Sequence, residues 1–193
     1  MACNGWGRQY WKCDEEDGPY RILYKIEPAL SYNRRLIESA MDEIEKHSRI
    51  EFEERYNQRC YLQFTKADGC FFQGASNCSP RISLGIGCRD FGTVLHEIMH
   101  AIGFEHEHNR PDRDDFLIIH RENIEPDNIN QFRKLSRYHY EWIDFAIDYQ
   151  SVMMYESYAF SKNGGITIQR RDGGIIRRND RLSRMDKDKL RML

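Results

Sequence analysis

The sequence predicts an α+β fold, with a mixed sheet and helices in the first part of the chain and a mostly irregular second part that ends in a helix. Three observations lead to this prediction. Short segments before residue 85 alternate apolar and polar residues as β-strands do, two longer segments repeat apolar residues at helical spacing, and regular patterns are scarce after Gly103. The 193 residues are enough for one domain, 1–193, with its own hydrophobic core.

Four short segments have strand-like sequences. In the first of them, Ile22, Tyr24 and Ile26 occupy every second position, which is the period of a strand with one buried face. The predicted strands are 20–26, 50–53, 61–64 and 81–84. Because they alternate irregularly with helical segments along the chain, a mixed sheet that carries helices is expected.

Three segments are predicted to be helical. The first runs from Ser31 to His47, and one of its faces is apolar. That face consists of Leu36, Ile37, Ala40, Met41 and Ile44. The second helix is predicted over 91–102. The third begins at Ser183, because Ser183 and Asp186 have the spacing of a helix-start capping box, and it continues to the end of the chain.

The composition excludes several classes of function. The net charge is −2 and the pI is about 6.4, so no partner of the nucleic-acid class is expected. No apolar run reaches the length of a membrane span, so none is predicted. The first thirteen residues lack the apolar core of a signal peptide, and the sequence is therefore interpreted as a mature or excised domain.

The cysteine content predicts disulfide bonds. The chain has six cysteines, none of them in a CxxC pair: Cys3, Cys13, Cys60, Cys70, Cys78 and Cys88. An even number in a domain of this size is typical of proteins from an oxidising compartment, so we expect the protein to be secreted. The residues alone leave about 15 possible pairings open.

A histidine motif lies in the predicted second helix. His96 and His100 are four residues apart, so both imidazoles lie on one helix face and can reach a single ion. Glu97 lies beside them and can hold a water at that ion. Gly103 can end the helix in a left-handed conformation, so that His106 approaches from another direction.

The motif predicts one catalytic zinc ion. Three neutral imidazoles leave a fourth position for water, which distinguishes a catalytic zinc site from a structural one. The competing interpretation is a polar helix with ordinary surface histidines. However, the extended pattern HExxHxxGxxH, which adds Gly103 and His106 at fixed offsets, is characteristic of the zinc peptidases called metzincins. Glu97 is then the general base that activates water and the acid that protonates the leaving amine.

Several stretches also resemble the catalytic domain of the astacin family of zinc peptidases. Residues 106–114, HEHNRPDRD, are close to the family's HExxRxDRD run, and residues 151–155, SVMMY, resemble its methionine turn. Residues 83–88, SLGIGC, match the segment before the active-site helix. The resemblance extends from about residue 21 to residue 193.

The resemblance implies a fold in two parts. The family has an upper subdomain of mixed sheet plus two helices, here about 1–103, and a lower, mostly irregular subdomain with a C-terminal helix, here about 104–193. A substrate cleft is expected between them. The segment from Arg81 to Leu84 would be the edge strand that pairs with an extended peptide.

The resemblance also assigns roles to single residues. His96, His100 and His106 would bind zinc and Glu97 would be catalytic. Tyr155 would be a weak zinc ligand that moves to stabilise the transition state. Met153 would support the metal from below. Glu107 would hold the ammonium group of the mature N-terminus.

The resemblance bears on the disulfides as well. It implies a bond between Cys70 and Cys88, which leaves Cys3 with Cys13 and Cys60 with Cys78 as the expected remaining pairs. The sequence departs from the family at Ser48, where a paired cysteine is usual, and at Met154, where a histidine is usual. One family disulfide is therefore expected to be missing.

The predicted function is a secreted zinc endopeptidase that cleaves extended polypeptides and acts as a monomer. An inactive, zinc-stabilised protein-binding module is the alternative, and a hydrolase of non-peptide substrates is a third possibility. A basic stretch, Arg170, Arg171, Arg177 and Arg178, either favours an acidic residue after the scissile bond or is a solvated loop.

Overall fold

The computed structural model describes residues 12–13, 18–74 and 78–193. The chain forms two compact units, which are described separately below. The first comprises Met1–Phe104 together with Asp186–Leu193, and the second comprises Glu105–Met185. The last eight residues, which the sequence grouped with the second part, thus belong to the first unit.

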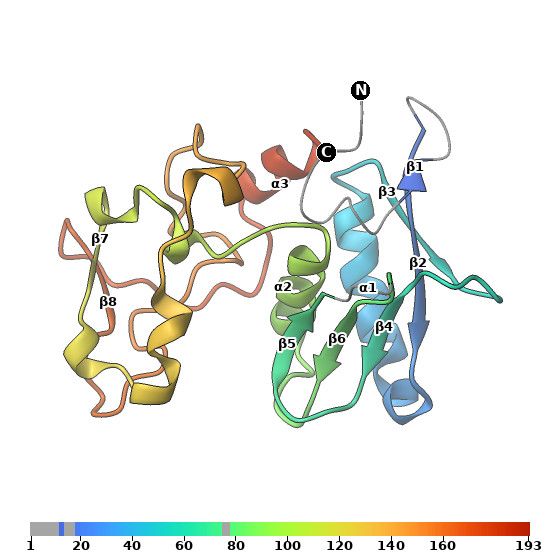
Figure 1. The fold of residues 1–193 in the computed structure, drawn as a ribbon, viewed down its shortest axis with the longest axis horizontal. Coiled ribbons are helices and arrows are strands. Elements are labelled where there is room, and N and C mark those ends of the chain that lie inside the picture. The colour runs from blue at the N-terminus through green and yellow to red at the C-terminus, as the bar shows by residue number, and fades with distance from the viewer. Residues whose placement is uncertain (1–11, 14–17, 75–77) are drawn as a thin grey trace. The chain divides into compact units, whose positions relative to one another are not determined.

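The first unit contains a six-stranded mixed sheet (Figure 1). Its strands are β1 (Lys12–Cys13), β2 (Tyr20–Ile26), β3 (Ile50–Glu54), β4 (Leu62–Thr65), β5 (Cys70–Gln73) and β6 (Arg81–Leu84). The strand order is β1-β2-β4-β6-β5, and β3 also pairs with β2. The pairs of β2 with β3, β2 with β4 and β4 with β6 are parallel, whereas β1 and β5 run antiparallel to their neighbours.

The prediction that Arg81–Leu84 is an edge strand is wrong. This strand, β6, pairs with β4 on one side and with β5 on the other, and β5 lies at the edge. Ile82, Ser83 and Leu84 are all fully buried, as expected for an interior strand that is covered on both faces. The periodicity of four residues cannot distinguish these two positions, because strand order is set by pairing across distant parts of the chain.

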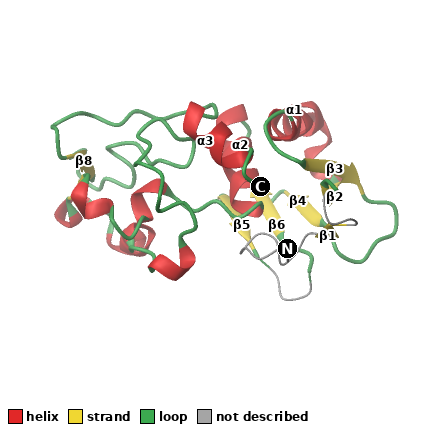
Figure 2. Cartoon of the chain, turned by 90° about the horizontal axis from the view of Figure 1, so that it is seen from above, coloured by secondary structure: helices red, strands yellow, loops and turns green. Residues whose placement is uncertain are grey.

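Helices α1 (Arg34–Glu45) and α2 (Phe91–Ala101) contact each other and lie on the same side of the sheet (Figure 2). The buried face of α1 consists of Ile37, Ala40, Met41 and Ile44, in agreement with the apolar face in the sequence. This helix begins three residues later than predicted, because the residues before it form a 3-10 helix, Pro28–Asn33. The short α3 (Arg184–Leu190) follows the predicted capping segment.

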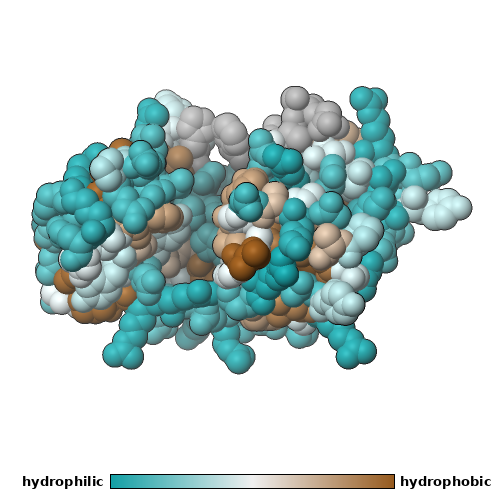
Figure 3. All heavy atoms as spheres, turned by 90° about the horizontal axis from the view of Figure 1, so that it is seen from below, coloured by the Kyte–Doolittle hydropathy of each residue, from teal (hydrophilic) through white to brown (hydrophobic). Residues whose placement is uncertain are grey.

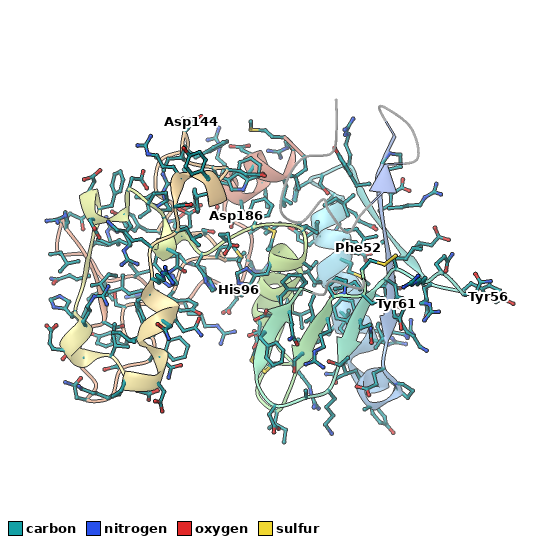
Figure 4. All side chains as sticks on the ribbon, in the orientation of Figure 1. Phe52, Tyr56, Tyr61, His96, Asp144 and Asp186 are labelled. Carbon is teal, nitrogen blue, oxygen red and sulfur yellow. A yellow bond between two sulfur atoms is a disulfide. The ribbon has the colours of Figure 1, made fainter. Side chains whose placement is uncertain are left out.

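Two disulfide bonds are present among the described residues. Cys70 pairs with Cys88, and Cys60 pairs with Cys78, as expected from the sequence. The expected Cys3–Cys13 pair lies outside the described residues. Figure 4 draws one of the sulfur–sulfur bonds in yellow, near the labelled Phe52 and Tyr61. Ser48, in place of the usual cysteine, accepts the amide of Ile50 and donates to the carbonyl of Ile44 at the end of α1.

The second unit has little regular structure, as predicted. Most of its regular structure consists of short 3-10 helices: Glu107–Asn109, Arg113–Asp115, Arg121–Asn123, Pro126–Phe132 and Arg137–His139. The antiparallel strands β7 (Leu117–Ile119) and β8 (Ile168–Arg170) were not predicted as a pair. The core of this unit consists of Leu117, Ile124, Phe132, Ile147, Met154, Ile168 and Ile176.

The face drawn in Figure 3 is mostly hydrophilic. Large apolar side chains that are strongly exposed, such as Tyr32, Tyr56 and Ile86, come from separate parts of the chain. None of the described helices has the length and hydropathy that a membrane span requires.

Candidate metal centre

Helix α2 supplies two of the histidines. Its first turn is capped by Asp90, whose carboxylate accepts hydrogen bonds from the backbone amide (3.0 Å) and the hydroxyl (2.8 Å) of Thr93. The rings of His96 and His100 are 4.7 Å apart, centroid to centroid, and nearly perpendicular. Figure 4 shows His96 extending from this helix. A helix fixed at its first turn therefore holds both imidazoles on one face.

The end of α2 directs the chain away from the helix. Gly103 has a φ of 101°, a conformation that a residue with a side chain rarely adopts. The following residue, Phe104, donates its amide to the carbonyl of Met99 (3.0 Å). Its own carbonyl lies 2.7 Å from Nδ1 of His100. Because a carbonyl only accepts, Nδ1 must carry the proton, so Nε2 of His100 is the nitrogen whose lone pair can bind a metal.

The three histidines of the motif meet at one point. His96, His100 and His106 each offer a ring nitrogen, and these atoms lie within 4.8 Å of one another. Among the residues that the structure describes, no other group of histidine, cysteine and acidic residues has this arrangement. Three imidazole nitrogens suit zinc, because zinc prefers nitrogen and sulfur ligands and has a catalytic form with three protein ligands. The donor set therefore fits the predicted ion.

Glu97 lies beside these ligands on α2 and is only 5% exposed. Burial raises its pKa to about 7, and a hydrogen bond from the backbone amide of Phe72, in the edge strand β5, acts in the opposite direction. The buried Oε2 atom has no hydrogen-bond partner among the described residues. A buried polar atom of this kind normally has a partner, so its position is suited to binding a water or a substrate group.

Met153 and Tyr155 lie in a turn of the second unit. Ser151, which is fully buried, accepts the amide of Met153 at its hydroxyl (2.9 Å) and the amide of Met154 at its carbonyl (3.1 Å). The carbonyl of Met153 accepts the amide of Glu107 (3.0 Å), the residue that follows His106. The turn is therefore tied to the chain segment that carries the third histidine.

The ring of Tyr155 is surrounded by other rings. Those of His106, His108, Phe132 and Phe160 have centroids between 4.1 and 6.3 Å from it. Met154 occupies the core of the same unit, which explains how an apolar side chain is accommodated where the family usually has a histidine.

Glu107 lies in a buried polar network that the sequence did not reveal. Its carboxylate accepts from the Tyr140 hydroxyl (2.9 Å) and from the amide of Asp148 (3.2 Å), and it forms an ion pair with Arg110 (3.7 Å). Burial and the nearby Glu107 raise the pKa of Tyr140, which keeps it a donor. The N-terminus, which we expected as the partner of Glu107, lies outside the described residues.

Most of the basic stretch is engaged within the second unit. Arg170 pairs with Asp172, Arg178 pairs with Asp180 (2.7 Å), and Arg171 donates to the carbonyl of Asp114 (2.6 Å). Arg177 is exposed. These contacts favour the interpretation as a solvated loop, because three of the four side chains are held by neighbouring groups and two of the charges are balanced by carboxylates.

Comparisons with known proteins agree with this geometry. A family model described as Astacin, a peptidase family, matches residues 10–193. The "Astacin-like metalloprotease toxin 1" of Loxosceles intermedia is 42% identical over 145 residues, which cover 74% of this chain and 54% of that protein. The "Zinc metalloproteinase nas-6" of Caenorhabditis elegans is 40% identical over 156 residues, or 80% of this chain and 45% of that protein. The match thus spans about half the length of these relatives.

A solved structure is similar over nearly the whole chain. High choriolytic enzyme 1, a hatching-enzyme zinc protease from Oryzias latipes, gives a TM-score of 0.85 at 27% identity, with coverage of 98% of this chain and 96% of that one. The α+β fold is therefore the one predicted, and the cofactor of such enzymes is one catalytic zinc ion, which the histidine group fits. The chain belongs to the astacin family of zinc metallopeptidases.

Proposed function

We propose that the protein is a secreted zinc endopeptidase that cleaves extended polypeptide substrates with the help of Glu97. The observation that carries this proposal is the combination on α2 of metal-ligating histidines with a buried carboxylate whose Oε2 has no partner among the described residues. A site that served only to stabilise the fold would not need that carboxylate.

His96, His100 and His106 would hold the zinc ion. The hydrogen bond from Nδ1 of His100 to the Phe104 carbonyl supports this role, because it orients the ring before the metal binds. When bound at such a site, zinc lowers the pKa of water and polarises a carbonyl group.

Glu97 would accept a proton from the attacking water and deliver it to the departing amine. The backbone amide of Phe72 donates a hydrogen bond to the carboxylate of Glu97. The Oε2 atom has no partner among the described residues and is available for the water. One buried carboxylate can thus serve as base and then as acid, because the surrounding protein excludes most competing water.

Tyr155 would donate its hydroxyl to the negative charge that develops on the substrate oxygen. Its ring lies 4.5 Å from that of His106, which supports a location near the metal. Met153, buried in the adjoining turn, would give apolar support below the ion. Glu107 would link the segment after His106 to the mature N-terminus, in addition to its contacts with Tyr140 and Arg110.

The edge strand β5 would bind the substrate. Within the described part of the first unit, β5 pairs with β6 on one side only, so its other side can form backbone hydrogen bonds with an extended peptide. The resemblance gave this role to Arg81–Leu84, and we propose Cys70–Gln73 instead because Arg81–Leu84 is an interior strand. Secretion is supported by the two disulfides, which form and persist in oxidising compartments.

Changing Glu97 to Gln tests the proposal. The amide cannot take a proton from water, so peptide hydrolysis should fall by about 10²–10⁴-fold while the bound zinc, measured in the same sample, stays near one ion per chain. His100→Ala is the matched control, since it should lose zinc together with activity. A Glu97→Gln protein that is as active as the parent would contradict the mechanism. A parent that binds zinc but cleaves no peptide would favour the binding module.

A further inference from the structure

We propose that His108 is a positioning residue that fixes the plane of the Tyr155 ring, and thereby the place from which the Tyr155 hydroxyl acts. The inference rests on the role proposed above for Tyr155 and names the residue that controls it.

The contact between the two rings is the first observation. His108 is fully buried, and its ring stacks on that of Tyr155 with centroids 4.1 Å apart and planes inclined by 26°. The rings of His106, Phe160 and Phe132 meet Tyr155 at 56°, 51° and 76°. Of these four rings, that of His108 is the most nearly parallel to Tyr155, and its face defines the plane in which Tyr155 lies.

His108 is itself held firmly. Its Nε2 lies 3.0 Å from the carbonyl oxygen of Gln131, which can only accept, so the hydrogen is assigned to Nε2. Its own carbonyl accepts Nη1 of Arg113 (2.8 Å), which also donates to the carbonyl of Phe132 (2.6 Å). Because both the ring and the backbone of His108 are bonded within the second unit, turning the ring would break a partly buried hydrogen bond.

This arrangement suits a tyrosine whose hydroxyl must act at a defined point. The terminal torsion of a tyrosine has broad energy minima, so the ring plane is not set by the side chain alone. A parallel stack resists tilting of the ring but permits sliding along the shared face. An aliphatic residue would fill the same volume without defining a plane, which separates a positioning role from simple core filling.

Two substitutions distinguish these roles. His108→Phe and His108→Leu both lose the bond to Gln131, whose oxygen keeps a second donor, Nδ2 of Asn109 at 2.8 Å. Only Phe keeps an aromatic face. We expect His108→Leu to lower kcat by about ten-fold with KM changed less than about two-fold, and His108→Phe to retain most of the parental kcat. Equal kcat losses in both variants would overturn the proposal.

A double-mutant cycle tests whether His108 acts through Tyr155. Tyr155→Phe should lower kcat by about 10²–10³-fold, as expected for the loss of one oxyanion donor. In that background His108→Leu should cost nothing further, because the hydroxyl that it positions is gone. An unchanged ten-fold cost there would show a general structural role and overturn the proposal. If Tyr155→Phe itself is fully active, the catalytic role of Tyr155 fails, and the ring contact is then tested by spectroscopy alone.

The spectroscopic test uses the metal-free protein labelled with fluorotyrosine. Of its eleven tyrosine signals, the one absent from Tyr155→Phe belongs to Tyr155. This signal should shift or broaden in His108→Leu and stay in place in His108→Phe. The control is Ile44→Val, a core change on the buried face of α1 in the first unit, which should leave the signal in place. A Tyr155 signal that is identical in His108→Leu and in the parent would overturn the proposal.

Discussion

The two units of this protein are stabilised in different ways. In the first, β-strands pair through their own backbone and two helices cover the sheet with apolar side chains such as Ile37 and Ile44. In the second, buried polar side chains bind backbone carbonyls that have no strand or helix partner. Arg110, which is 1% exposed, donates to the carbonyls of Trp142 (3.4 Å), Ile143 (3.3 Å) and Phe145 (2.8 Å).

This difference follows from the need to satisfy buried backbone groups. The carbonyls of a chain without strands or helices cannot accept from a regular set of backbone amides and need other donors. A guanidinium group provides five N–H donors in a fixed plane. Asn109 does the same for Gln131 and Arg133. An irregular region can thus be as well defined as a sheet, but its stability depends on few side chains.

The largest effect is therefore expected at Arg110. Changing Arg110 to Ala removes the buried cation beside Glu107 and leaves three carbonyls with fewer donors, so the free energy of unfolding should fall by about 3–5 kcal/mol. Urea unfolding measures this loss.

The control for that prediction is Arg34→Ala in the first unit. Arg110 binds the carboxylates of Glu107 (3.7 Å) and Asp112 (2.9 Å). Arg34 likewise binds two, those of Glu38 (3.0 Å) and Glu54 (2.8 Å), but its side chain is 37% exposed. Its loss should cost only about 0–1 kcal/mol. If Arg110→Ala and Arg34→Ala lost similar free energies of unfolding, burial of the arginine would not explain the difference between the two units.

The next effect is expected from the Cys60–Cys78 bond of the first unit. Replacing both cysteines by Ala releases the segment before β4 from the segment before β6, which are otherwise joined by a hydrogen bond from the Ser79 hydroxyl to the Arg59 carbonyl (3.0 Å). The unfolding free energy should fall by about 2–4 kcal/mol, because the unfolded chain gains freedom. Thermal unfolding of the double variant checks this, and an unchanged melting temperature would refute it.

A smaller effect is expected at the first turn of α2. Asp90→Ala removes the cap on the amide of Thr93 and should lower stability by about 0.5–2 kcal/mol. Asp90→Asn keeps an acceptor and should cost less. Because zinc binding is linked to the same helix, the loss should also appear as a weaker affinity for zinc in a chelator competition. A stability loss as large as that of Arg110→Ala would contradict the ranking of the two regions.

The smallest effect is the pH dependence of stability that comes from His120, which follows β7 and bonds to Gln169 of β8. Hydrogen bonds to Gln169 and Glu122 raise the pKa of His120 in the folded state. Stability from this group is therefore fully present below its unfolded pKa, about 6.5, and is lost as the pH rises through the higher folded value. His120→Gln should thus be more destabilising relative to the parent at pH 5 than at pH 8. A difference of opposite sign would exclude this coupling.

The sequence by itself determined four strands and the two longer helices of the first unit, though not β1 or β5, and it determined which three histidines come together. Periods of two and of 3.6 residues specify which face is buried, and the HExxHxxGxxH spacing specifies which nitrogens can meet, because both depend on local geometry. The left-handed Gly103 is likewise a local property, and the structure agrees with it.

Only the tertiary structure decided the strand order, the β7–β8 pair and the buried network of Glu107, Arg110 and Tyr140. The same holds for the stack of His108 on Tyr155. Each of these joins residues that are distant in sequence and have no periodic pattern. The resemblance placed Arg81–Leu84 at the edge, which β5 occupies instead, and the four residues could not correct this because they carry no information about their neighbours. Local chemistry is encoded in spacing, whereas pairing depends on the whole chain having folded.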